Sequence, residues 1–231
     1  MKRLMCLCVP MVLIAGLAAL APAGDVKPVE VKGGGQFIDP DGDCKLREEN
    51  GKWFVGVPGV YHDLWPKKGK VNAPRILRDA AGDFRVQARI HGQIKAEKGT
   101  AIPDLASSAA FRAGSLLIWQ DENDFVRMDR AGMNKDGKEY SFCYYHIFKN
   151  GERIVQQSRA LKNTDTDFRL EWRGGKVHAG FSQDGGKSWK SLPVESVEFK
   201  GKLKAGVAAL NTTSKPLTVE VSQFEISPIK N

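Results

Sequence analysis

Apolar and polar residues alternate along most of this chain with a period of two, which is typical of strands that bury one face. In residues 83–91 the aliphatic and aromatic side chains share one parity, and the charged or polar side chains take the other. Comparable runs cover residues 113–119, 125–130, 139–149, 152–159, 168–172 and 176–182. The pattern predicts an all-β protein with almost no helix.

The connections between these runs are short and rich in glycine. Asn150-Gly151 and Gly174-Gly175 each separate two strand-like segments. Such pairs favour two-residue hairpin turns, because those turns need positive φ angles that glycine and asparagine adopt most easily. We therefore expect consecutive strands to pair in an antiparallel manner.

The N-terminus resembles a secretion signal. A basic start, Met1-Lys2-Arg3, precedes an apolar run over residues 4–20 and an Ala-Pro-Ala cleavage pattern at 21–23. We predict a signal peptide at 1–23, a flexible lead at 24–36 and a single domain at 37–231, exported to the periplasm or the extracellular space. The alternative is an uncleaved membrane anchor. After cleavage we expect no membrane span.

The charge of the chain argues against nucleic-acid binding. The net charge is +8, and Lys2 and Arg3 of the predicted signal carry two of these charges. The remaining basic residues alternate with acidic ones instead of forming the clustered stripe that a nucleic-acid reader displays. An acidic polysaccharide suits this mixed but basic surface. The sequence does not indicate an oligomeric state.

Two cysteines, Cys44 and Cys143, remain beyond the predicted signal. An oxidising compartment permits a disulfide between them. Two separate buried thiols are the open alternative. Without a histidine cluster beside them, two cysteines do not predict a zinc site, and we predict no bound metal and no cofactor.

The segment SQDGGKSW at residues 182–189 resembles the Asp-box of sialidases and related β proteins. Asp184 can accept hydrogen bonds from turn amides, and the two glycines permit positive φ. In sialidases this motif recurs in every blade and lies away from the active site, so the resemblance implies a structural hairpin. We expect Trp189 to be buried beneath it.

A second resemblance extends from about residue 39 to residue 227. It rests on the order of several segments: 82–84, 113–127, 184–189, 204–208 and 221–226. In this order they resemble the bacterial domain of unknown function related to the regulation-of-enolase protein, a member of the concanavalin A-like lectin/glucanase superfamily. The resemblance implies an antiparallel two-sheet jelly-roll sandwich. It implies no catalytic residues.

Known catalytic patterns are missing from the sequence. It lacks the E-x-D-x-x-E strand of the superfamily's glucanases, a nucleophile elbow, a zinc-protease motif and a phosphate-binding loop. The acidic stretch at 121–124 lies between two strands and is interpreted as a solvated turn. The segment DPDGD at 39–43 has the oxygen density of a calcium loop, but the EF-hand glycine and glutamate are absent, so we interpret it as a tight turn.

The residues at 140–148 give the main evidence for a binding face. If Cys143 and Ile147 point into the core, Tyr144 and His146 point outward. We expect Arg127 and Asp129 of the preceding strand to lie beside them and form the floor of an open groove on a concave sheet. The predicted ligand-binding residues are Trp119, Arg127, Asp129, Tyr144 and His146, with Trp172 as the alternative to Trp119 at the edge. In the other interpretation these aromatics belong to the core.

Aromatic rings beside Arg, Asp and His suit a sugar, because a ring stacks on the apolar face of a pyranose while polar groups bond its hydroxyls. We therefore predict a secreted, non-catalytic, lectin-like protein that binds an oligosaccharide or polysaccharide. The alternative is a glycan-active hydrolase or lyase with an unrecognised site. An interaction or envelope-scaffold domain is the third possibility.

Overall fold

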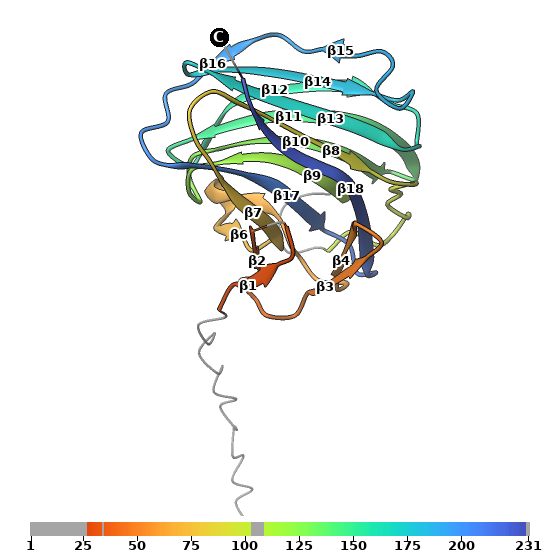
Figure 1. The fold of residues 1–231 in the computed structure, drawn as a ribbon. Coiled ribbons are helices and arrows are strands. Elements are labelled where there is room, and N and C mark those ends of the chain that lie inside the picture. The colour runs from red at the N-terminus through yellow and green to blue at the C-terminus, as the bar shows by residue number, and fades with distance from the viewer. Residues whose placement is uncertain (1–26, 34, 103–108, 230–231) are drawn as a thin grey trace, which may run out of the picture.

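Two antiparallel sheets pack face to face in the computed structural model, which describes residues 27–33, 35–102 and 109–229 (Figure 1). Sheet A has the strand order β1 (Val29–Val31), β2 (Gly35–Ile38), β7 (Arg75–Ala80), β17 (Leu203–Asn211), β9 (Ala109–Trp119), β10 (Phe125–Lys135), β11 (Lys138–Lys149) and β12 (Glu152–Ala160). The predicted fold class, an all-β antiparallel two-sheet jelly-roll sandwich, is confirmed.

Sheet B lies against sheet A and contains the hairpin of β13 and β14, which turns at the predicted Gly174-Gly175. Its order is β15 (Lys190–Ser191), β14 (Lys176–Ser182), β13 (Thr166–Arg173), β8 (Phe84–Ile90), β18 (Leu217–Pro228), β4 (Lys52–Val57) and β3 (Lys45–Glu49), and β16 (Glu195–Ser196) pairs with β14. A third element, β5 (Leu64–Trp65), the 3-10 helix η1 (Pro66–Lys68) and β6 (Lys70–Val71), belongs to neither sheet.

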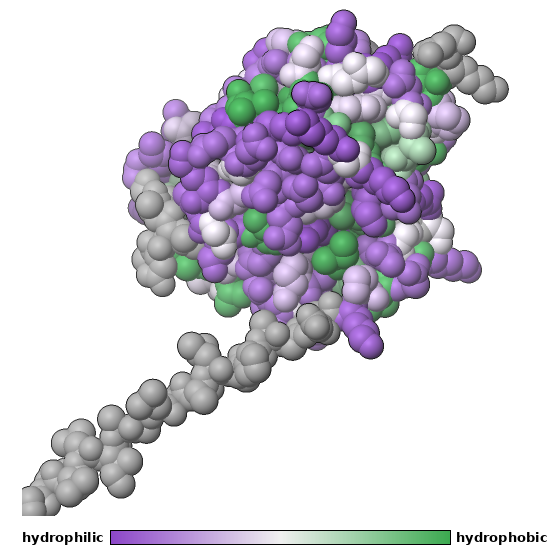
Figure 2. Space-filling view, turned by 90° about the vertical axis from the view of Figure 1, so that its left-hand side faces the viewer, coloured by the Kyte–Doolittle hydropathy of each residue, from purple (hydrophilic) through white to green (hydrophobic). Residues whose placement is uncertain are grey.

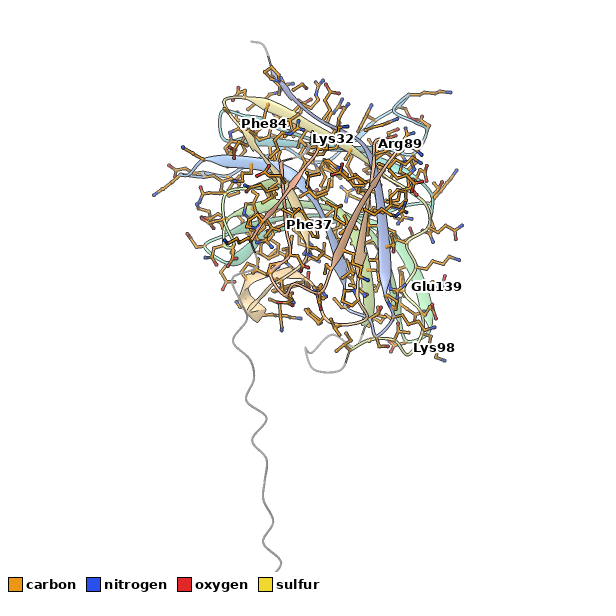
Figure 3. The ribbon with its side chains drawn as sticks, turned by 60° about the horizontal axis from the view of Figure 1, so that its bottom comes forward. Lys32, Phe37, Phe84, Arg89, Lys98 and Glu139 are labelled. Atoms are coloured by element: carbon orange, nitrogen blue, oxygen red, sulfur yellow. The ribbon has the colours of Figure 1, made fainter. Side chains whose placement is uncertain are left out.

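Strand β8 shows how the alternation builds the core. Phe84 and Ile90 are buried, whereas Arg85 and Arg89 reach the outer face of sheet B and pair there with Glu171 and Asp167 respectively, each at 2.7 Å. The buried side chains of both sheets fill the space between them (Figure 3), where Phe37 and Phe84 lie inside and Lys98 and Glu139 lie at the periphery. Charged outer positions give the largely hydrophilic surface of Figure 2.

The second face of sheet A is also covered, by the segment 58–73, which we call the strap. Leu64 and Ala73 of the strap are fully buried against Leu117 and Leu210 of the sheet. Gly59 is needed at its start, because a Cβ there would lie 2.4 Å from the carbonyl oxygen of Ser214. The burial of these apolar side chains explains why the strap packs against the sheet.

Two other expectations change in the structure. Part of the expected flexible lead at 24–36 is ordered, since Val29–Val31 pairs with β2. Trp189 is not a core residue: it is only partly buried, donates from Nε1 to the Gly186 carbonyl at 3.1 Å and lies under the Arg169 guanidinium at 4.4 Å. The hairpin around it is held by Asp184, which accepts from the Ser188 amide at 2.9 Å and from the hydroxyl of Ser182 at 2.7 Å.

The cysteines and the acidic turn noted in the sequence have simple structural positions. Cys44 and Cys143 are free thiols, the first half-buried and the second buried. Asp121 accepts from the amides of Asn123 and Asp124 at 2.8 and 3.0 Å, as expected for a turn. The predicted signal peptide at 1–23 lies outside the described residues. Within the described part of the chain, no helix has the length and apolar character needed to cross a membrane.

The different burial of two aromatic residues leads to a stability prediction. Phe168→Ala removes a fully buried ring from the core and should lower the free energy of unfolding by about 3–5 kcal/mol. Trp189→Ala removes one hydrogen bond and one cation–π contact at the surface and should cost only about 1–2 kcal/mol. Urea unfolding of both variants measures the difference, and an equal or reversed order would contradict the placement of Trp189.

Candidate functional site

The polar residues of β10 and β11 gather on the face of sheet A that the strap covers. In the antiparallel register Arg127 lies opposite His146, and Asp129 lies opposite Tyr144. On the other side of β10, Ser115 of β9 lies opposite Asp129. Alternation therefore brings these side chains to one face, while Cys143, Tyr145 and Ile147 point into the core between the sheets.

Arg127 is the centre of this arrangement. Its Nη1 donates to Asp63 Oδ1 at 2.9 Å and to the Leu64 carbonyl at 3.0 Å, and both acceptors belong to the strap. Its Nε lies 3.1 Å from Asp129 Oδ2, an ion pair that lacks hydrogen-bond alignment. Only 1% of Arg127 is exposed. The prediction that Arg127 and Asp129 form the floor of an open groove is therefore wrong, because the strap covers both residues.

Asp129 lies behind Arg127, away from solvent. Its Oδ1 accepts from the Ser115 hydroxyl at 2.6 Å, and no part of its side chain is exposed. Burial raises its pKa to about 6, although Arg127 and Ser115 favour the ionised form. Asp129 is not among the described residues that line the cavity under the strap, and its contact with Arg127 positions the guanidinium.

His146 presents a buried N–H group. Arg127 Nη2 lies 3.3 Å from His146 Nδ1, and a guanidinium can only donate, so Nδ1 accepts and Nε2 carries the proton. Burial lowers the pKa of His146 well below its usual range, and the charges of Arg127 and Arg153 lower it further, so the ring is neutral. Among the described residues Nε2 has no hydrogen-bond partner.

A cavity of about 150 Å³ separates the strap from sheet A at this point. The strap contributes Tyr61, Asp63 and Trp65 to its wall, and sheet A contributes Tyr144, His146 and Arg153. Its size is below that of typical pockets for drug-sized ligands, and its mixture of rings and polar groups suits one ring of a larger polar ligand. Buried donors and half-exposed aromatics thus line one partly open cavity.

Cations gather at the mouth of the cavity around Trp65. The Arg153 guanidinium lies 4.6 Å from the Trp65 ring centre, and the Lys68 ammonium lies 4.8 Å from it. Burial and the charge of Arg127 lower the pKa of Arg153, which shows that the two guanidinium groups repel each other. The Trp65 ring thus contacts two cations beside the His146 N–H donor.

The five predicted ligand-binding residues therefore separate into two groups. Arg127, Tyr144 and His146 line the cavity, and the rings of Tyr144 and His146 stack at 4.9 Å. Asp129 lies behind Arg127. Trp119 lies on the same face of the sheet but packs on Phe125 at 4.9 Å, outside the cavity wall. Trp172, the alternative edge residue, belongs to sheet B.

The sequence analysis missed the contribution of the strap and of β12. Tyr61, Asp63 and Trp65 come from a segment without periodic pattern, and Arg153 comes from β12, a predicted strand that was not assigned to the binding face. The available signal was the presence of two aromatic residues in a polar loop. Only the fold places that loop over β10 and β11.

A wider depression of about 590 Å³ lies at the edge of the sandwich. Trp172 and Phe199 line it and stack face to face with ring centres 5.4 Å apart. Its charged neighbours, such as Asp79 and Lys202, are on the surface. Because the charged residues described in its wall are exposed or half-exposed, the smaller cavity under the strap is the stronger candidate site.

The chain resembles known proteins in its fold and not in its sequence. No family model and no curated protein sequence matches the chain. The chain is similar to a functionally unknown protein from Saccharomyces cerevisiae, with a TM-score of 0.67 and 13% identity over 86% of this chain and 98% of that one. At this identity the likeness concerns the fold alone.

Two further solved structures share this fold. The GH43 protein BlXynB from Bacillus licheniformis has a TM-score of 0.61 and 11% identity, over 84% of this chain and 36% of that one. The CBM2 module of the evolved Dit of Lactobacillus casei BL23 phage J-1 has a TM-score of 0.52 and 7% identity, over 81% of each chain. The present chain thus spans about a third of the length of the GH43 protein.

The burial of Arg127 predicts a large stability cost for its removal. Arg127→Ala leaves Asp63 and Asp129 buried without their cation and should lower the free energy of unfolding by about 3–5 kcal/mol. Arg159→Ala, which removes an exposed arginine from β12, should change it by less than about 0.5 kcal/mol. Chemical unfolding measures both, and a cost for Arg127→Ala as small as the control's would contradict the buried cluster.

The raised pKa of Asp129 predicts a pH dependence of stability. Because its pKa is about 6 in the folded protein and 3.8 ordinarily, the folded state binds the proton first as pH falls. The Asp129 contribution should thus raise stability between about pH 6 and pH 4, by roughly 1–3 kcal/mol, and disfavour folding above pH 6. Carboxylates with lowered pKa, such as Glu171, act in the opposite sense.

This contribution is isolated by comparing pH profiles of the unfolding free energy for the wild type and Asp129→Asn. The variant keeps a side chain that can bond Ser115 but cannot titrate. Between pH 7 and pH 4 the wild type should gain stability relative to the variant. Parallel profiles would show that Asp129 titrates normally.

Proposed function

We propose that the protein is an exported glycan-binding protein and that its ligand enters the cavity under the strap. The observation that carries the proposal is the unpartnered His146 Nε2–H, buried in a cavity whose mouth holds Arg153 and Lys68 beside Trp65. Buried donors normally have a hydrogen-bond acceptor, so an unpartnered donor that faces a cavity indicates that a ligand supplies the acceptor. Names of similar structures, a GH43 protein and a CBM2 module, support a glycan as the ligand.

The charges favour an acidic sugar, such as a uronic acid. Among the cavity-lining residues, Arg127, Arg153 and Lys68 are basic, and Asp63 is the one carboxylate in the described wall. Asp63 is already engaged by Arg127 and by the Leu64 amide at 2.7 Å. A carboxylate placed between Arg153 and the His146 N–H would relieve the repulsion between the two guanidinium groups. The half-buried rings of Tyr144 and Phe111 offer an apolar wall to the sugar ring.

The same geometry favours binding without cleavage. Glycoside hydrolysis needs two carboxylates that flank the scissile bond. Among the described residues, Asp63 is the one carboxylate that lines the cavity, and Asp129 is buried behind Arg127. His146 presents an N–H and not a lone pair, so it serves as a donor and not as a base. The hydrolase alternative therefore lacks a second carboxylate in the described wall.

The remaining parts of the proposal come from the sequence. The signal-like residues 1–23 support export, and the ordered motifs between residues 39 and 227 support membership of the concanavalin A-like superfamily. The basic but unclustered charge supports a polysaccharide partner over nucleic acid. We propose that residues 37–231 act as one such domain.

A glycan array with matched neutral and uronate-containing oligosaccharides tests the proposal, followed by calorimetric titration of the strongest ligand. We expect acidic glycans to bind. Their neutral counterparts should bind at least about tenfold more weakly, because a neutral sugar offers no carboxylate to Arg153. Arg153→Ala should weaken binding by about tenfold or more, and Tyr144→Ala should also weaken it. Arg159→Ala, on the same strand but outside the cavity, should bind like the wild type.

Melting curves of all variants separate lost binding from lost folding. Equal binding by Arg153→Ala, Tyr144→Ala and wild type would contradict the assigned site. A preference for neutral glycans would contradict the ligand class. Turnover of the bound glycan, followed by the appearance of reducing ends or unsaturated products, would establish the enzyme alternative.

A further inference from the structure

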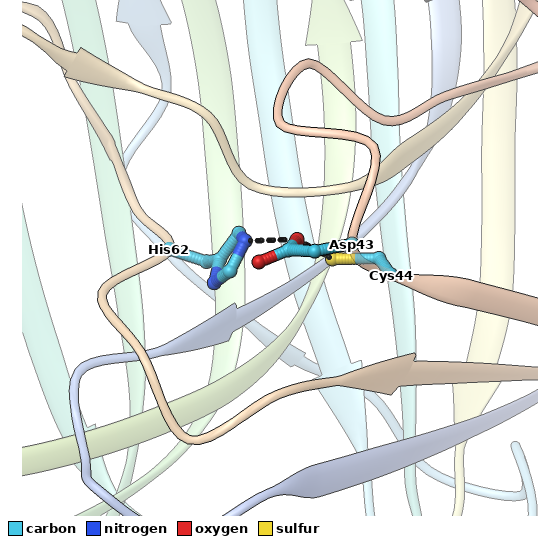
Figure 4. Close-up of side chains that lie close together, drawn as sticks. All are labelled: Asp43, Cys44 and His62. Atoms are coloured by element: carbon cyan, nitrogen blue, oxygen red, sulfur yellow. Dashed lines mark hydrogen bonds and ion pairs between the residues drawn. The ribbon is translucent and has the colours of Figure 1, made fainter. Parts of the chain in front are cut away.

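A second group of chemically reactive side chains lies at the outer edge of the strap, separate from the cavity wall. Asp43 and Cys44 end the loop between β2 and β3, and His62 lies in the strap (Figure 4). The carboxylate oxygen, the sulfur and the imidazole nitrogen all lie within 4.8 Å of one another. Chain segments about twenty residues apart thus bring oxygen, sulfur and nitrogen donors together.

His62 is held in the orientation that metal-binding histidines adopt. Its side chain is fully buried, and its Nδ1 lies 3.2 Å from the Val60 carbonyl, so Nδ1 carries a proton. A histidine fixed in this way by a backbone carbonyl directs Nε2 at the metal. In His62, Nε2 points at Asp43 Oδ1 at 2.9 Å, and Asp41 Oδ2 lies 3.7 Å from it. The backbone of His62 is fixed by two hydrogen bonds with Asn211, of 2.8 and 2.9 Å.

A buried carboxylate oxygen beside the cluster lacks a partner. Asp39 is 7% exposed, and its Oδ2 accepts from the Cys44 amide at 2.8 Å. Its Oδ1 is buried and makes no hydrogen bond within the described part of the chain. Three carboxylates, of Asp39, Asp41 and Asp43, therefore converge around one thiol and one imidazole, and an unpaired buried carboxylate oxygen is costly without a cation nearby.

We propose that this cluster binds a zinc ion through Asp43, Cys44 and His62, with Asp41 as the fourth ligand. Zinc favours four-coordinate sites made of sulfur, nitrogen and carboxylate oxygen, whereas calcium and magnesium favour oxygen alone. The Asp43, Cys44 and His62 donor atoms lie within 4.8 Å of one another, which is near the spacing that zinc–ligand bonds of about 2.0–2.3 Å require. On binding, Cys44 coordinates as the thiolate and its proton is released to solvent.

The site has a structural consequence for the strap. Asn72 Nδ2 donates to Asp41 Oδ2 at 2.6 Å and to the Tyr61 carbonyl at 2.8 Å, so the β2–β3 loop and the strap are already joined there. The contact of His62 with Asp43 joins them a second time, and zinc would replace it with bonds to His62, Asp43 and Cys44. Tyr61 and Asp63, the neighbours of His62, face the cavity. The ion therefore stabilises the cover of the cavity, and this inference does not depend on what the cavity binds.

Metal titration of the untagged, reduced protein after chelator treatment tests the inference. Calorimetry with Zn²⁺ should give one ion per chain, and Zn²⁺ should raise the melting temperature. Cobalt(II) should give a thiolate charge-transfer band in the near-ultraviolet. Cys44→Ser should abolish this band and weaken zinc binding by about tenfold or more, and Asp43→Asn should weaken binding similarly.

Matched variants keep the result interpretable. Cys143→Ala removes the other thiol, and Asp79→Asn removes an exposed carboxylate of β7; both should bind zinc like the wild type. Asp43 is partly exposed, so Asp43→Asn should fold even if Cys44→Ser is unstable, and melting curves in chelator verify this. Absence of binding, undiminished binding by Cys44→Ser and Asp43→Asn, or tighter binding of Ca²⁺ than of Zn²⁺ would each overturn the inference.

Discussion

The guanidinium of Arg127 joins the strap to sheet A, and the site depends on this one buried interaction. One cation lies between Asp63 of the strap and Asp129 of its own strand, and it also donates to a strap carbonyl. Taking these charges out of water is costly, so the cluster persists only because each member is paired or hydrogen-bonded. The strap position is thereby fixed in relation to β10 and β11.

Around this cluster the sandwich gains a third layer. Most two-sheet sandwiches bury one face of each sheet, but sheet A buries apolar side chains on both faces. This explains the long apolar runs of β9, β10 and β11, in which both parities are occupied by buried residues. The cavity is the place where the strap and the sheet separate, at the half-exposed rings of Tyr144 and Trp65.

The strap also links the two proposed sites. Alternate residues along it serve different neighbours: Tyr61 and Asp63 face the cavity, while His62 faces the β2–β3 loop. The alternation of an extended backbone produces this division, since successive side chains point to opposite sides. A glycan and a metal ion would thus act on opposite sides of one short segment, and neither requires the other's residues.

The sequence by itself determined the fold class and the strand faces. Period-two alternation and glycine turns are local signals, and burial follows directly from them, as β8 and β13 illustrate. The same alternation was enough to bring Arg127, Asp129, Tyr144 and His146 to one face, because adjacent strands of a hairpin have a fixed register.

Only the tertiary structure decided which of those residues reach a ligand. Segment 58–73 has no periodic pattern, and its position over sheet A results from long-range contacts of Leu64, Asp63 and His62. Because of these contacts, Asp129 and Arg127 are buried and Arg127 has a structural role. Trp65 and Arg153 lie in the cavity wall for the same reason. The zinc ligands likewise come from two loops, whose proximity no local pattern specifies, because the packing of distant segments depends on the whole core.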